Sequence, residues 1–164
     1  MTRVGPVATN PRMDPKRMQV EVVRRAPMVS IDLVIEDGRG RVLVGMRVNE
    51  PAKGCWFVPG GRVLKDERLD DAYARVLWRE VGWRGRRQDA EFLGAFEHFY
   101  DANFAGEPEV TTHYVVLSYR LVVPDPPPVT PDDQHEHLEW MPIPELLAHP
   151  AVHENTKVYF RRVT

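Results

Sequence analysis

Short hydrophobic runs separated by polar turns predict several strands in the first third of the chain. Residues 29–35 alternate in part and end at the turn 37–40, after which residues 42–47 resume the same pattern. Residues 55–58 form another apolar run, which is stopped by Pro59 and two glycines. We therefore expect a strand, a turn, a second strand and a third short strand followed by a glycine loop.

The spacing of apolar positions changes to that of a helix between residues 69 and 81. Apolar side chains recur three and four positions apart, and Glu80 continues the same stripe, before Gly82 offers a C-terminal stop. The pattern predicts that strand, glycine loop and helix follow one another directly. It also predicts that the carboxylate of Glu80 faces inward.

The second half of the chain predicts two longer strands and a final helical segment. Residues 91–100 and 113–123 are strand-like and are separated by a polar segment, 101–109, which we interpret as a lid or an edge loop. The prolines at 124–128 lead into a polar loop at 132–137, then a short strand at 138–141, and the pattern turns helical from Pro142.

The ends and the composition indicate one soluble domain. We expect a flexible extension over residues 1–20 and a single domain over residues 21–164, because the first residues lack any period. No run approaches the roughly 20 apolar residues of a membrane helix, and no secretory signal is recognisable, so we expect a cytoplasmic protein without a membrane partner. The single cysteine, Cys55, excludes an internal disulfide framework and is expected to be a buried small hydrophobe.

The charge balance argues against a broad nucleic-acid surface. The formal net charge is −2, yet 22 Lys and Arg residues are enough to build a local anion pocket. Any phosphate-bearing partner is therefore expected to be small.

Glu80 is the first candidate for chemistry. An inward-facing carboxylate needs a cation, a proton or a hydrogen-bond partner, and the spacing alone leaves open whether it binds a metal ion or pairs with an arginine. Gly60 and Gly61 permit a tight turn that exposes a carbonyl to an oxygen-seeking cation, and Arg62 follows where it can meet a phosphate.

These residues lie within a segment that resembles the Nudix box. The matching positions are in register: Gly61, Glu67, Arg75, Leu77, Glu80 and Gly82. Val76 and Arg79 replace two of the glutamates that the signature usually carries on the helix, and Trp83 takes the final apolar place. The resemblance to the Nudix hydrolase family implies an α/β fold, the Nudix α/β/α sandwich with a mixed central sheet.

The reduced box is similar to that of the GDP-mannose mannosyl hydrolases within this family. Further segments resemble them in order: residues 27–32, 56–63, 98–101, 103–104, 111–117 and 133–135. The resemblance implies hydrolysis of a nucleoside diphosphate sugar by water attack on the anomeric carbon with inversion. GDP-mannose is the first substrate it indicates, and GDP-glucose is a second candidate. One Mg²⁺ ion would be held by the carbonyl of Gly60, the carboxylate of Glu80 and the side-chain oxygen of Gln134.

The same resemblance assigns roles to the other candidates. His135 would be the general base, with His137 as its nearest competitor. The leaving diphosphate would be stabilised by Arg47, Arg62 and Tyr114, and the sugar or an oxocarbenium-like centre by Asp32 and His98. Glu67 is interpreted as a residue that orients the loop and Arg75 as structural, while base recognition stays open among three aromatic residues that either stack on a base or merely pack: Phe99, Tyr100 and Phe104.

Two other functions and one assembly remain open from the sequence. A pyrophosphatase would split the diphosphate and would need metal ligands other than Val76 and Arg79, and a non-catalytic sensor would only bind the nucleotide sugar. The resemblance also implies a homodimer, for which the N-terminal extension and the loop 101–109 are the candidate contacts.

Overall fold

The structure is a computed structural model and describes residues 14–129 and 135–161. In chain order the elements are α1 (Pro15–Arg25), β1 (Met28–Glu36), β2 (Arg41–Arg47), β3 (Trp56–Phe57), β4 (Gly60–Arg62), α2 (Leu69–Val81), the 3-10 helix η1 (Arg87–Asp89), β5 (Glu91–Tyr100), β6 (Thr112–Val122), β7 (His135–Pro142), α3 (Ile143–Ala148), α4 (Glu154–Lys157) and the 3-10 helix η2 (Val158–Phe160). None of the described helices has the length and apolar character needed to cross a bilayer.

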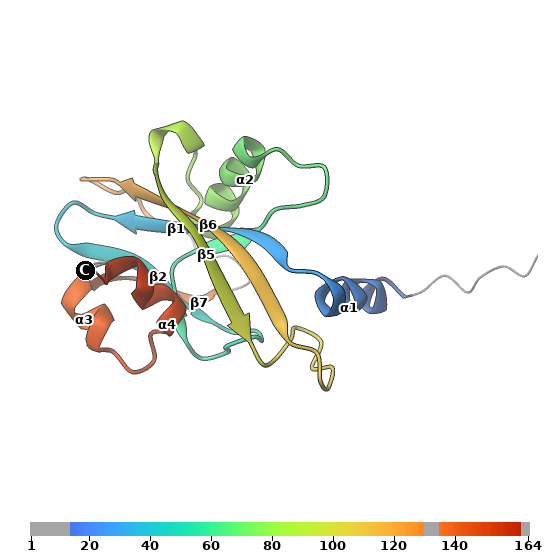
Figure 1. Ribbon diagram of the computed structural model, residues 1–164. Helices are drawn as coiled ribbons and strands as arrows, with labels where there is room; N and C mark the ends of the chain where they lie inside the picture. The colour runs from blue at the N-terminus through green and yellow to red at the C-terminus, as the bar shows by residue number, and fades with distance from the viewer. Residues whose placement is uncertain (1–13, 130–134, 162–164) are drawn as a thin grey trace, which may run out of the picture.

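The strands form a mixed sheet with helices on both sides (Figure 1). Its path runs β3-β2-β1-β6-β5, while β4 pairs with β1 and β7 pairs with β2. Strands β1 and β6 are parallel, and the other pairs are antiparallel. Helix α2 lies on one side of the sheet and α3 and α4 on the other, which confirms the α/β/α sandwich with a mixed sheet.

Alternation along the strands divides the interior into two apolar layers. The layer under α2 joins Ile31 and Leu33 of β1 to Tyr73 and Leu77 of the helix. The opposite layer joins residues from β1, β2, β7 and the C-terminal segment, namely Val34, Val42, Val44, Met141, Leu146 and Val152. Burial of each such side chain stabilises the fold by roughly 1.5–3 kcal/mol. The two layers therefore hold the helices against the two faces of the sheet.

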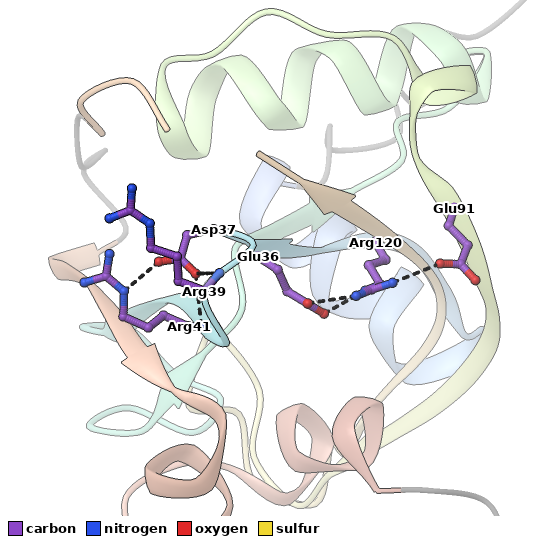
Figure 2. Close-up of polar contacts among 6 residues, drawn as sticks. All are labelled: Glu36, Asp37, Arg39, Arg41, Glu91 and Arg120. Atoms are coloured by element: carbon purple, nitrogen blue, oxygen red, sulfur yellow. Dashed lines mark hydrogen bonds and ion pairs between the residues drawn. The ribbon is translucent and has the colours of Figure 1, made fainter. Parts of the chain in front are cut away.

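Ion pairs tie β1, β6 and β5 together at the end of β1 (Figure 2). Arg120 donates from Nε and Nη2 to the two carboxylate oxygens of Glu36 at 2.7 and 2.9 Å, and its Nη1 lies 3.5 Å from Glu91 Oε2. In the adjoining turn, buried Asp37 accepts from the backbone N–H groups of Arg39 and Arg41 at 2.8 and 3.1 Å. These contacts hold the parallel pair in register, since no hairpin joins β1 to β6.

The N-terminal segment differs from the sequence expectation. Residues 15–20 are helical rather than flexible, because Val20 and Val23 of α1 bury themselves against Val110. Pro15 stands in the first turn, where its missing N–H costs nothing, and Glu21 pairs with arginines three and four positions on. Residues 1–13 lie outside the described part of the chain.

Two smaller differences concern the segment before α2. Residues 60–62, expected as part of a loop, form strand β4, because their backbone pairs with residues 30–32 of β1. Cys55 is half-buried instead of buried, since it precedes β3 rather than lying within it.

Candidate active site

A cavity of about 230 Å³ is lined by strands of the sheet and by one side of α2, and it gathers most of the residues expected from the sequence. Seven of them line it: Asp32, Arg47, Gly60, Arg62, Glu80, His98 and Tyr114. These residues come from β1, β2, β4, α2, β5 and β6, so the sheet topology, and not proximity in sequence, assembles the site.

The other two expected residues fall partly or wholly outside the description. Gln134 lies outside the described residues. The backbone of His135 begins β7 and pairs opposite Arg47, whose side chain lines the cavity, while the His135 side chain is outside the description. His137 does not line the cavity; its exposed ring lies 3.3 Å from Glu139 Oε2 and edge-on to Trp56.

Helix α2 presents one carboxylate to the cavity. Glu80 is only 2% exposed, which confirms that the apolar stripe carries it inward. Val76 and Arg79 line the same cavity, so a methyl group and a guanidinium stand where the usual Nudix box has acids. Gly61 lies close to Val76, because a Cβ there would stand 3.1 Å from Val76 Cγ2.

The donor set at this end fits a single hard cation. Among the described residues no group of three or more His, Cys, Asp and Glu side chains converges. Glu80 lines the same cavity as Gly60 and Gly61, and carboxylate and carbonyl oxygens are the hard donors that Mg²⁺ prefers.

Glu67 and Arg75 hold the loop that leads from β4 to α2. Arg75 donates from Nε and Nη2 to the Glu67 carboxylate at 2.6 and 2.9 Å, and from Nη2 to the carbonyl of Arg62 at 2.7 Å. Glu67 also accepts from the N–H of Leu64 at 2.9 Å. The Arg75 guanidinium keeps the pKa of Glu67 below its usual value, so the pair stays charged and fixes the loop at neutral pH.

A chain of hydrogen bonds lies at the sugar end expected from the sequence. The Tyr159 hydroxyl donates to Asp32 Oδ2 at 2.7 Å and lies 3.2 Å from His98 Nε2. Burial and the positive charge of His153 lower the pKa of His98 to about 4, so its ring is neutral at pH 7. Because the Tyr159 proton points to Asp32, His98 donates from Nε2–H to the Tyr159 oxygen.

Asp32 is a buried carboxylate with a raised pKa. Burial raises its pKa to about 6, while the hydrogen bond from Tyr159 and the charge of Arg47 act in the opposite direction. Its side chain projects opposite Ile31 and Leu33, both fully buried, as the alternation predicts. Asp32 is therefore mainly ionised at neutral pH and close to titration just below it.

Tyr159 is the site residue that the sequence did not reveal. It stands between Val158 and Phe160, in an apolar stretch that carries no sign of a polar site. Its partner Asp32 is 127 positions away along the chain. No local pattern indicates such a contact.

Two arginines and a tyrosine form the positively charged wall. The Arg47 guanidinium lies 5.3 Å from the centre of the Phe57 ring, and Arg62 is exposed at the mouth. Burial raises the pKa of Tyr114, so its hydroxyl stays protonated and is able to donate to a phosphate oxygen.

Comparisons with known proteins agree with this geometry. A family model described as the NUDIX domain matches residues 26–162. The low-salt glycan biosynthesis protein Agl8 of Haloferax volcanii is 41% identical over 131 residues, which is 80% of this chain and 81% of that protein. The crystal structure of a MutT NUDIX hydrolase from Burkholderia pseudomallei superimposes with a TM-score of 0.66 and 28% identity, covering 85% of this chain and 100% of that one.

A further solved structure shares the fold at lower identity. The NUDIX domain of Shewanella oneidensis NrtR, solved with ADP ribose, has a TM-score of 0.62 and 21% identity over 92% of both chains. At this identity the likeness concerns the fold alone.

Proposed function

The chain belongs to the NUDIX domain family, and we propose that this hydrolase cleaves a nucleoside diphosphate sugar at the glycosidic carbon–oxygen bond. Water attacks the anomeric carbon, the bond from that carbon to the diphosphate oxygen breaks, and the free sugar and the nucleoside diphosphate leave. GDP-mannose is the first substrate to test and GDP-glucose the second.

The observation that carries this proposal is that α2 presents a single carboxylate to the cavity. Glu80 faces the cavity, whereas Val76 and Arg79 stand where further acidic ligands would be needed to hold several ions against a bridging diphosphate. Attack at phosphorus is favoured by two ions that bind both the attacking and the leaving oxygen. Departure of an intact diphosphate from carbon requires only that its growing charge be neutralised.

The two ends of the cavity support the division of roles. Arg47, Arg62 and the Tyr114 hydroxyl supply donors for a leaving diphosphate. Asp32, mainly ionised at neutral pH, supplies negative charge for an oxocarbenium-like sugar, and Tyr159 keeps its carboxylate oriented. His135, by resemblance, takes the proton of the attacking water.

A bound Mg²⁺ ion would supply charge neutralisation at the diphosphate. Glu80 and the carbonyl of Gly60 are the described residues proposed to hold it, and Gln134 is proposed as the third ligand from the resemblance. Glu80 is the one carboxylate of α2 among the described residues that line the cavity, which supports one ion per site.

Hydrolysis in ¹⁸O-labelled water tests the proposal directly. With GDP-mannose and Mg²⁺ we expect label in the free sugar, GDP as the other product, and inversion at the anomeric carbon by NMR. Label in the phosphates of GMP or mannose phosphate would show attack at phosphorus and establish a pyrophosphatase. Binding without turnover would establish a sensor, and the Glu80→Gln variant, purified in parallel, controls for contaminating hydrolases.

A further inference from the structure

A second cavity, of about 500 Å³, adjoins the first on the side of helix α1. The two cavities share Arg47, Asn49, Arg62 and Tyr114. The wall between them is therefore the part of the site to which we assign the diphosphate. A ligand with its diphosphate on this wall has one end in each cavity.

Beyond the shared wall, the second cavity is lined by parts of the chain to which no catalytic role is assigned. Helix α1 contributes Gln19 and Val23, the segment after β2 contributes residues 48–51 and Lys53, and the loop between β5 and β6 contributes Phe104. Helix α1 precedes residues 26–162, which the family model matches. One wall of this cavity thus comes from residues that precede the family-model match.

The structure separates the three aromatic residues that were candidates for base stacking. Phe104 lines the second cavity and keeps 40% of its surface exposed. Tyr100 lines the first cavity, next to the sugar end. Phe99 lines neither and stacks on His113 instead, with ring centres 4.4 Å apart. Phe104 alone of the three is available to a base beyond the diphosphate wall.

Phe104 is carried by a loop that is fixed from inside. The buried side chain of Asn103 accepts from the N–H groups of Ala105 and Glu107, both at 3.1 Å, and donates to the carbonyls of Glu107 and Val110, both at 2.8 Å. A ring held on such a loop loses little conformational entropy when a planar ligand binds to it.

Helix α1 reaches the shared wall through one polar contact. With its amide oxygen turned toward Arg62, Gln19 accepts from both Nη atoms at 2.6 and 2.7 Å. Val20 and Val23 anchor the helix on Val110, which follows the Phe104 loop. Gln19 therefore orients the guanidinium that faces the diphosphate.

We propose that the second cavity binds the nucleoside of the substrate, with its base against Phe104, and that Gln19 is a positioning residue for Arg62. This assignment rests on the proposed function, because it takes the diphosphate to lie on the shared wall. It predicts that the nucleoside and the phosphates are recognised by separable groups.

Binding of GDP and of inorganic pyrophosphate, each with Mg²⁺, separates those groups by calorimetry on the full chain. The wild type is expected to bind GDP more tightly than pyrophosphate. Phe104→Ala is expected to weaken GDP binding roughly 5- to 150-fold, the loss typical of one base stacked on an aromatic ring, and to leave pyrophosphate binding unchanged. Phe104→Tyr keeps a ring and should retain GDP affinity, and Phe99→Ala is the matched control that should change neither ligand.

The Gln19 variants test the second half of the proposal. Gln19→Ala should weaken both ligands, because both carry the phosphates that Arg62 contacts. Gln19→Met keeps the length of the side chain but removes the acceptor for Arg62, and it should weaken both ligands to a similar extent. Equal losses of GDP and pyrophosphate binding in Phe104→Ala, or a wild type that binds the two equally, would overturn the nucleoside site. Unchanged binding of GDP and of pyrophosphate by Gln19→Ala would overturn the positioning role.

Turnover of GDP-mannose is measured on the same samples. If the binding pattern holds without release of free sugar, the nucleoside site stands and the proposed reaction fails. If free sugar is released while GDP binds no more tightly than pyrophosphate, the proposed reaction stands and the nucleoside site fails.

Discussion

At the scale of single residues, the site depends on where three protons sit. His98 is neutral because it is buried, and the Tyr159 proton goes to Asp32, so the Tyr159 oxygen accepts from His98. This order leaves Asp32 as the acceptor at the end of the chain. A carboxylate kept ionised opposite a sugar is what an oxocarbenium-like transition state requires.

Tyr159→Phe removes the hydrogen bond that lowers the pKa of Asp32. Since burial still raises that pKa, we expect it to move further above about 6, so the acid limb of the kcat/KM profile shifts to higher pH and activity at pH 7 falls. Tyr119→Phe, a tyrosine that lines neither cavity, is the control. An acid limb at the wild-type position would show that Tyr159 does not act on Asp32.

Glu80→Gln keeps the size of the side chain and removes its charge. Because Mg²⁺ prefers charged oxygen ligands, we expect the ion's dissociation constant to rise roughly tenfold or more. Calorimetry with Mg²⁺ alone measures this without requiring turnover, and the exposed Glu145→Gln serves as control. An unchanged Mg²⁺ affinity would remove Glu80 from the ligand set.

The two histidines at the start of β7 are distinguished by paired variants. His135→Ala is expected to lower kcat by roughly 10²–10⁴-fold while KM changes little, as for loss of a general base. His137→Ala should leave the rate nearly unchanged, because its ring pairs with Glu139 outside the cavity. The reverse result would transfer the role to His137.

At the scale of elements, the hydrophobic pattern predicted the helices and strands whose formation depends on local sequence. The bounds of α2 and β5 match the expected ranges, because each buries a regular series of side chains. Strand β4 escaped prediction because glycines carry no apolar signal and its backbone partner is β1. The same holds for the site. The local Nudix motif predicted Glu80, whereas the contact of Tyr159 with Asp32 depends on tertiary packing and could not be predicted.

Gly60→Ala is expected to disturb the pairing of β4 with β1. A Cβ at Gly60 would lie 2.4 Å from Asp32 Oδ1 and 2.8 Å from the carbonyl oxygen of Ile31, a backbone atom that cannot rotate away. We expect a loss of roughly 1–3 kcal/mol in urea unfolding and reduced turnover. Gly61→Ala, which meets only a Val76 methyl at 3.1 Å, should cost less; equal costs would mean that the contact with β1 is not what demands glycine.

At the scale of the whole molecule, the buried histidine makes stability depend on pH. The contribution of neutral His98 is fully present above pH 6.5 and is lost as the pH falls toward about 4, because the unfolded chain takes up the proton first. Asp32 acts in the opposite sense: its raised pKa stabilises the folded state as the pH falls from about 6 toward 3.8. The two effects offset one another in the wild type.

Replacing Asp32 by a residue that does not titrate isolates the pH dependence that comes from His98. In an Asp32→Asn background, the free energy of unfolding should fall by roughly 3 kcal/mol between pH 7 and pH 4, and adding His98→Gln should abolish most of that fall. Urea unfolding at several pH values provides the measurement. Identical slopes with and without His98 would mean that another group titrates.

Helix α1 lies before the family-model match and still contributes to the second cavity. It supplies a wall of that cavity and a partner for Arg62. A chain trimmed to the shared domain would keep Glu80 and Asp32 while losing that wall. Changes confined to this helix are therefore expected to reshape the second cavity while leaving the groups proposed to break the bond in place.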